Sequence, residues 1–157
     1  MKNAILTVGK PKASYIAEGL SFYARRLKPW GGCELLAAKG VRAGKSMPDA
    51  EVKAKEGMNL LARISEKDTV WALDQKGSAW PSTTWAERLN QLRERGASRL
   101  VLVVGGALGL SPEVIARAEA RVSLGPATMA HEVAALVAAE QLYRAYTIIA
   151  GTPYHRA

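Results

Sequence analysis

One stretch of the sequence constrains the fold more than any other: an apolar run that ends in two glycines and leads into a helix start. Residues 100–104 are all Leu or Val, the pattern of a parallel strand that is buried on both faces. Gly105 and Gly106 let the backbone turn sharply or approach a ligand closely. Ser111 can then cap a helix that begins at Pro112. A strand, a glycine turn and a capped helix form the unit with which α/β proteins hold a small ligand.

Strand and helix patterns alternate along the rest of the chain. Thr84 and Glu87 have the spacing of a capping box, and residues 75–77 have the composition of a turn that ends a strand at Asp74. This alternation predicts one α/β domain over residues 1–157, with a mostly parallel sheet flanked by helices. The predicted strands are 3–8, 34–38, 69–73, 100–104 and 122–124, and the predicted helices are 14–28, 46–64, 84–96, 112–120 and 130–145.

Composition narrows the class of protein. Cys33 is the one cysteine, which excludes an internal disulfide and a multi-cysteine zinc site and suits a reducing cytoplasm. The formal net charge is +8, and residues 1–45 carry nine Lys or Arg against two Glu. This asymmetry favours a polyanionic partner, such as a nucleic acid, on the N-terminal part; a solubilising surface is the plainer alternative.

The last predicted helix is apolar nearly all round, from Val133 through Ala139 to Leu142. A helix of this kind is buried on more than one side. In so small a chain we expect one of those sides to meet a second subunit, so that Ala138→Glu would weaken a homodimer.

Two glycine motifs point to other functions but fit them poorly. Residues 40–46 resemble a phosphate-binding P-loop, yet its first glycine is Gly40, one residue too close to Gly44. The 105–109 stretch lacks the Gly-x-Gly-x-x-Gly fingerprint and comes late in the chain, which disfavours a nicotinamide enzyme. A P-loop-like nucleotide-binding protein therefore remains the less favoured alternative.

Several segments taken together carry a resemblance to a known family. The opening Val8-Gly9-Lys10, Glu56-Gly57, the glycine turn at 105–106, the stretch 140–145 (Glu-Gln-Leu-Tyr-Arg-Ala) and the closing 153–156 (Pro-Tyr-His-Arg) span nearly the whole chain. Each segment is weak alone, but the combination closely resembles the RlmH family of bacterial large-subunit ribosomal RNA methyltransferases, minimal members of the SPOUT class.

This resemblance implies a fold and a cofactor. SPOUT enzymes have a deep C-terminal trefoil knot, which would span roughly residues 70–157 here, an exception to the rule that chains are unknotted. Three loops would bind S-adenosylmethionine, and the glycines in them would leave room for the ligand, although Gly105 and Gly106 could simply turn the chain. The implied cofactor-binding residues are Leu73, Gly105, Leu124, Gly125, Pro126, Ala127, Thr128 and Met129.

The resemblance also implies a reaction, namely methylation of N3 of a pseudouridine in helix 69 of 23S ribosomal RNA on the ribosome. No metal is required, because the nucleophile belongs to the RNA base. The implied catalytic residues are Arg144, Tyr154 and His155, the implied RNA-binding residues are Arg25, Arg26 and Lys28, and the implied assembly is a homodimer. Alternatives stay open for single residues: Arg144 could form a structural ion pair with Glu140, and His155 could lie in a frayed tail. His131 could cap or pack at the start of the last helix.

Three positions depart from the pattern of that family. Ala130 and Ala135 stand where the family usually has Pro and Arg around His131, and Leu108 replaces an acidic or amide residue. Loss of that Arg weakens the expectation that RNA is positioned for catalysis. A non-catalytic RNA-binding relative is therefore the rival interpretation.

Overall fold

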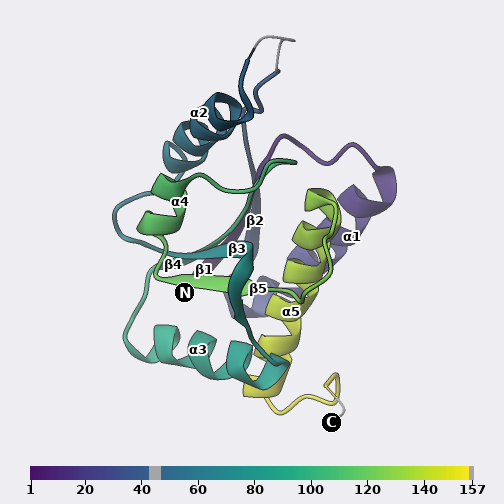
Figure 1. The fold of residues 1–157 in the computed structure, drawn as a ribbon. Helices are drawn as coiled ribbons and strands as arrows, with labels where there is room; N and C mark the ends of the chain where they lie inside the picture. The colour runs from purple at the N-terminus through teal and green to yellow at the C-terminus, as the bar shows by residue number, and fades with distance from the viewer. Residues whose placement is uncertain (43–46, 156–157) are drawn as a thin grey trace.

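The structure is a computed structural model that describes residues 1–42 and 47–155, and in this part of the chain five parallel strands form one sheet (Figure 1). The strand order is β2-β1-β4-β3-β5. None of the helices in the described residues is both long and apolar enough to cross a membrane. The elements are β1 (Lys2–Val8), α1 (Ser14–Arg26), the short 3-10 helix η1 (Lys28–Trp30), β2 (Cys33–Ala38), α2 (Asp49–Leu61), β3 (Asp68–Ala79), α3 (Ser82–Glu94), β4 (Arg99–Val104), α4 (Pro112–Arg117), β5 (Ala120–Ser123) and α5 (His131–Ile149).

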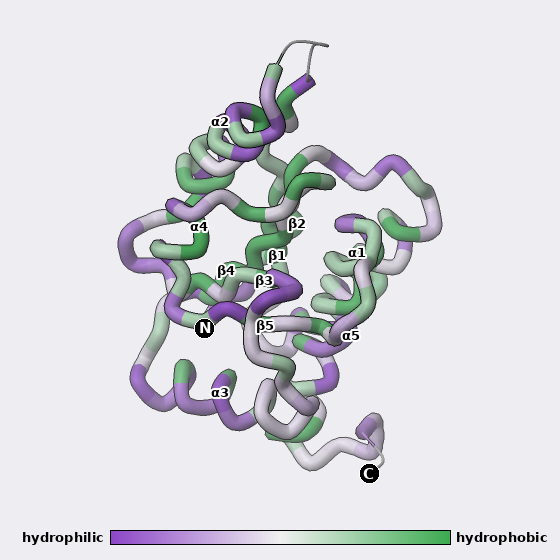
Figure 2. Tube along the Cα trace, in the orientation of Figure 1, coloured by the Kyte–Doolittle hydropathy of each residue, from purple (hydrophilic) through white to green (hydrophobic). Residues whose placement is uncertain are grey.

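Strand β4 lies at the centre of the sheet, between β1 and β3, and is buried on both faces as its sequence predicts. Its alternate side chains enter two hydrophobic clusters, Leu102 with α1, α3 and α5, and Val103 with α2 and α4. Three helices therefore cover one face and two cover the other, and Figure 2 shows the hydrophobic centre between them. The predicted α/β architecture is confirmed; the trefoil knot stays a prediction.

The predicted turn at residues 75–77 is wrong, because β3 continues to Ala79. Its pairing with β5 shifts register between Leu73 and Ser78, both of which face Val122. A Cβ on Gly77 would lie 2.6 Å from the backbone carbon of Arg121. The glycine therefore marks an irregularity where two strands approach closely. The composition of residues 75–77 resembles that of a turn for this reason.

Several helix ends also differ from their predictions: α2 ends at Leu61 and α4 at Arg117, each three residues early. The capping box fails because α3 begins at Ser82, with Pro81 at its N-cap and Thr84 already inside the helix. Helix α5 runs to Ile149, four residues beyond the predicted end. Its last turns are held by tertiary contacts: Tyr146 stacks on Trp30 and donates a hydrogen bond of 3.0 Å to Asn3 Oδ1. In contrast, Ser111 caps α4 as predicted. Residues 43–46 of the P-loop-like stretch lie outside the described residues.

At the amino ends of β3 and β4, Asp68 and Arg99 form a two-pronged ion pair with N–O distances of 2.9 and 2.5 Å. The hydrogen bond from Arg99 holds the pKa of the Asp68 carboxyl below its usual value. We expect Asp68→Asn to lower the free energy of unfolding by about 2 kcal/mol at neutral pH. The difference should disappear as the pH falls through the lowered pKa of Asp68, since the wild-type carboxylate is then protonated. Urea titrations from neutral pH to about pH 2 measure this, and a pH-independent difference would contradict it.

Candidate methyl-donor pocket and C-terminal cluster

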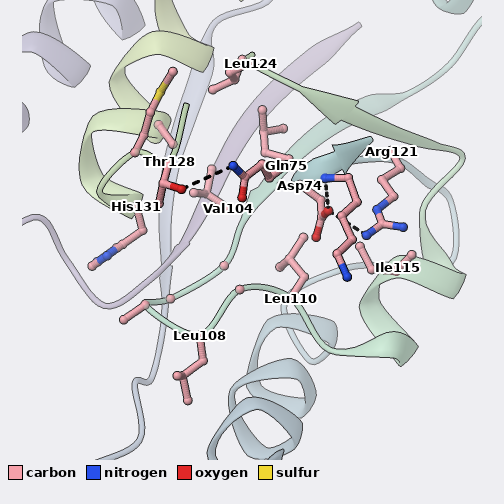
Figure 3. Close-up of a pocket in the computed structure, with 18 of the residues that line it drawn as sticks. Asp74, Gln75, Val104, Leu108, Leu110, Ile115, Arg121, Leu124, Thr128 and His131 are labelled. Carbon is pink, nitrogen blue, oxygen red and sulfur yellow. Dashed lines mark hydrogen bonds and ion pairs between the residues drawn. The ribbon is translucent and has the colours of Figure 1, made fainter. Parts of the chain in front are cut away.

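A cavity of about 760 Å³ opens at the carboxyl ends of β4 and β5, beside residues 73–76 of β3 (Figure 3). This is the edge at which open α/β sheets bind ligands, and the volume is in the range of small-molecule sites. Leu73, Val104, Leu110, Ile115 and Leu124 give it apolar walls. The start of α5 closes one side with His131.

The cavity brings together most of the residues that the sequence implied for a cofactor. Leu73 and Gly105 line it from the strands, and Leu124, Gly125 and residues 127–129 line it from the loop after β5. Pro126 is not among the lining residues; its carbonyl oxygen accepts a hydrogen bond of 2.8 Å from Gln75 Nε2.

Gln75 is a site residue that sequence reasoning missed. The same amide nitrogen lies 3.3 Å from the Thr128 hydroxyl oxygen, so one side chain ties β3 to the loop after β5 (Figure 3). Gln75 can do so because β3 continues past Asp74, where a turn was predicted. A strand pattern that continued through residue 79 would have placed Gln75 beside the loop after β5. Gly77 interrupts that pattern in the sequence.

The glycine turn packs against itself. Gly109 donates its N–H to the Gly106 carbonyl at 3.0 Å, and its φ of +80° is one that side-chain-bearing residues rarely adopt. A Cβ on Gly105 would lie 2.6 Å from the backbone carbon of Gly109 and 2.9 Å from the nitrogen of Leu110. Gly105 thus makes room for the backbone of its own loop. This room was predicted to serve a ligand.

Another part of the cavity lining carries charged side chains. Asp74 Oδ1 accepts the backbone N–H of Lys76 at 2.7 Å and pairs with Arg121 at 2.7 Å (Figure 3). Lys53 and Lys76 also line the cavity. One end of the cavity therefore offers apolar surface and backbone groups, and the other offers mainly positive charge with one carboxylate.

Arg144, Tyr154 and His155 come together in a second group, which we call the C-terminal cluster. The Arg144 guanidinium lies 4.8 Å from the centre of the Tyr154 ring, and its Nη1 is 3.4 Å from His155 Nδ1. Arg144 also pairs with Glu140, so the ion pair considered as an alternative is present. The Tyr154 hydroxyl donates to Glu140 Oε1 at 3.1 Å. Tyr154 and His155 are therefore packed onto α5.

The cluster and the cavity lie toward opposite ends of α5, since His131 at its start lines the cavity and Arg144 lies near its other end. His131 on the cavity wall and Arg144 are 13 residues apart in one helix, roughly 20 Å along its axis. The structure thus unites the predicted catalytic side chains with one another but places them away from the predicted cofactor loops of the same chain.

One of the predicted RNA-binding residues joins the C-terminal cluster. Arg26, at the end of α1, donates a hydrogen bond of 3.3 Å to the Tyr143 hydroxyl and lies over the Phe22 ring at 4.5 Å. Tyr143 in turn packs edge-on against Tyr154 at 4.8 Å between ring centres. Arg25 lies beside Arg26 in the last turn of α1, and Lys28 begins η1. All three cations therefore lie at the C-terminal end of α1.

Two pKa values in the cluster are shifted. Burial, reinforced by the hydrogen bond with Tyr23 and by the Glu140 charge, raises the pKa of the Tyr154 phenol. The hydrogen bond to Glu140 raises the pKa of Arg144. Tyr154 therefore keeps its proton across the working pH range and acts as a hydrogen-bond donor.

Comparison with known proteins decides the family. The family model described as "Predicted SPOUT methyltransferase" matches residues 1–155. The chain belongs to the SPOUT methyltransferase family. Proteins named Ribosomal RNA large subunit methyltransferase H from Limosilactobacillus fermentum and Limosilactobacillus reuteri are each 41% identical to it, over 99% of this chain and all of theirs. A probable methyltransferase from Bordetella pertussis Tohama I shares the fold, with a TM-score of 0.56 at 18% identity, over 91% of this chain and 94% of that one.

Within this SPOUT methyltransferase, the three unusual positions have clear surroundings. Leu108 lines the cavity, and Ala130 is the N-cap of α5. Ala135, on α5, is fully buried in the hydrophobic cluster that α1, α3 and α5 form with the sheet. An arginine at position 135 would place a charge in that cluster, so here the position serves packing. Residues 1–42 and 47–155 hold no group of three or more side chains suited to bind a metal ion.

Proposed function

We propose that this SPOUT methyltransferase transfers a methyl group from S-adenosylmethionine to the ribosomal RNA of the large subunit. The observation that carries the proposal is the cavity that gathers Leu73, Gly105 and the loop at 124–129. The names of the full-length relatives support the RNA substrate. The finer assignment is N3 of a pseudouridine in helix 69 of 23S ribosomal RNA, modified in the cytoplasm on the assembled ribosome.

The residues of the cavity fit S-adenosylmethionine. Leu73, Leu110 and Ile115 would enclose the flat adenine, and the close-packed glycine loop would present backbone groups to the adenosine. Lys76 and Arg121 at the charged end would suit the carboxylate of the methionine part, and Asp74 its ammonium group. When bound, the group supplies an electrophilic methyl on a sulfonium.

The C-terminal cluster supplies the chemistry that the RNA base needs. Methylation at N3 requires that N3 lose its proton, which passes to solvent water, and the negative charge that develops spreads to the carbonyl oxygens of the ring. Arg144 provides a fixed positive charge for those oxygens, and such preorganised charge lowers the barrier. Tyr154 offers an aromatic face on which the base can stack.

His155 acts as a donor in this arrangement. Arginine nitrogens only donate, so the His155 Nδ1 that faces Arg144 accepts, and the proton of the neutral ring is on Nε2. Nε2–H can therefore bind a carbonyl oxygen of the base.

We further propose that a homodimer completes the active site. A single chain holds the cavity and the C-terminal cluster roughly 20 Å apart along α5, so the cluster that serves each cavity would come from the partner. The surfaces available for this contact are apolar: Tyr15 and Phe22 on α1 are 66% and 42% exposed, and Val137 on α5 is half-buried. Arg25, Arg26 and Lys28 then lie beside the cluster that receives the base, where they can contact RNA phosphates.

Transfer of a labelled methyl group from S-adenosylmethionine to ribosomes, with the modified base located by mass spectrometry, tests the function. Ribosome binding without methyl transfer would favour the non-catalytic RNA-binding relative. Methylation at a different base would refute the finer assignment.

We expect Arg144→Lys to lower the single-turnover rate of methyl transfer about tenfold, roughly 1.4 kcal/mol, because lysine keeps the charge but loses the planar fork. Affinity for S-adenosylmethionine should stay unchanged, since Arg144 lies away from the cavity. Arg95→Lys, in an exposed ion pair with Glu119, is the matched control. Equal rates for the two variants would contradict a role for Arg144 in the reaction.

A further inference from the structure

Glu140 has more partners than an ordinary helix ion pair requires. Its Oε1 accepts from Arg144 Nε at 3.0 Å and from the Tyr154 hydroxyl at 3.1 Å, and its side chain is 19% exposed. Its Oε2 accepts from Gln141 Nε2 at 2.7 Å. Both oxygens of the carboxylate are therefore engaged.

The neighbouring helix fixes this carboxylate in place. Gln141 uses its Oε1 to accept from the Ser82 hydroxyl at 2.8 Å, and Ser82 is the first residue of α3. The orientation of Glu140 is thus connected through Gln141 to a second helix, which packs closely against α5. Such a linked set of hydrogen bonds restrains each member more than an isolated pair would.

From Glu140 the restraint passes to Tyr154 and His155. The Tyr154 hydroxyl has one hydrogen and donates it to Glu140, so the Tyr23 hydroxyl at 3.5 Å must donate to Tyr154. Arg144, held at Nε by Glu140, keeps Nη1 toward His155. One carboxylate therefore determines where three functional side chains of the C-terminal cluster lie.

We propose that Glu140 is a positioning residue, whose carboxylate holds Arg144 and Tyr154 in the orientation that methyl transfer requires. The inference rests on the function proposed above. Glu140 itself touches neither the cavity nor the base; it acts through Arg144 and Tyr154.

A second ion pair of the same chain provides the contrast. Glu51 and Lys55 on α2 have the same i, i+4 spacing, 2.6 Å apart, with side chains about half exposed. A pair of this kind contributes little to stability. If Glu140 merely paired along its helix, removal of its charge would have the same small consequence as removal of the Glu51 charge.

The test compares Glu140→Gln with Glu51→Gln. We expect Glu140→Gln to lower the single-turnover rate on saturating ribosomes about fivefold, while affinity for S-adenosylmethionine and the melting temperature match those of Glu51→Gln. Amide hydrogen exchange of Thr152, Tyr154 and His155 should accelerate in Glu140→Gln alone, because Tyr154 loses its anchor on α5.

Tyr154→Phe completes a double-mutant cycle with Glu140→Gln. If Tyr154 depends on Glu140 for its orientation, the two losses should combine to less than their product. An active wild type with equal rates for Glu140→Gln and Glu51→Gln overturns the inference alone, as does a rate loss matched by an equal loss of cofactor affinity. An inactive wild type overturns the proposed function, and the positioning role with it.

Discussion

Gly105→Ala is expected to reduce the affinity for S-adenosylmethionine at least a hundredfold, or about 2.7 kcal/mol. The added Cβ would lie 2.6 Å from one backbone atom of Gly109 and 2.9 Å from one of Leu110, with no flexible side chain to give way. The turn at 106–109 must then move as a unit, and it forms one wall of the cavity. Isothermal titration with the cofactor measures the loss.

Gly40→Ala is the matched control for this prediction. Its Cβ would meet Val8 at 3.5 Å and Glu56 at 3.9 Å, which are ordinary contacts. Both variants make the same chemical change in a loop, so a general effect of glycine replacement would appear in both. Normal cofactor binding by Gly105→Ala would place the methyl-donor site elsewhere.

Ala138→Glu is expected to unfold the protein at ambient temperature, and this corrects the expectation that it would weaken a dimer. Ala138 is fully buried within its own chain, among the residues beneath α1, α3 and α5. A carboxylate there would lack a partner and would overfill a packed core. Circular dichroism should show loss of the cooperative thermal transition.

Val137→Glu, one residue earlier on α5, is the informative change for assembly. Val137 is half-buried, and its helix neighbour Ala138 takes the inward position. We expect Val137→Glu to melt nearly as the wild type does but to reduce its mass in light scattering from dimer to monomer. A wild type that is already monomeric at micromolar concentration would refute the homodimer.

Patterns of local sequence predicted the centre of this fold well. The apolar run at 100–104 predicted a buried strand, the glycines after it a turn, and Ser111 a helix start. These independent signals support one another. Residues 75–77 misled because Gly77 accommodates the backbone of Arg121, which lies 44 positions away in the sequence. Such a contact leaves no local trace.

The site was predictable in its parts but not in its arrangement. The family resemblance supplied Leu73, Gly105 and Arg144, and the structure places the first two on one cavity and the third at the other end of α5. Gln75 acts through hydrogen bonds to the loop after β5, and Glu140 through a hydrogen bond from Tyr154 beyond the expected pair with Arg144. Nothing in the local sequence predicts these contacts between distant segments.

The order of strands in the sheet has a consequence for how the chain is made. Strand β1 lies inside the sheet, and its residue Lys2 lies opposite Arg99 in the register of β1 and β4. Asn3, also on β1, accepts a hydrogen bond from Tyr146. Strand β1 is synthesised first, but its edge toward β4 stays open until most of the chain has been made. Contacts so distant in sequence fold slowly, and an open strand edge attracts other chains. We expect the yield of native protein during synthesis to depend on what shields the open edge of β1 until β4 has been made.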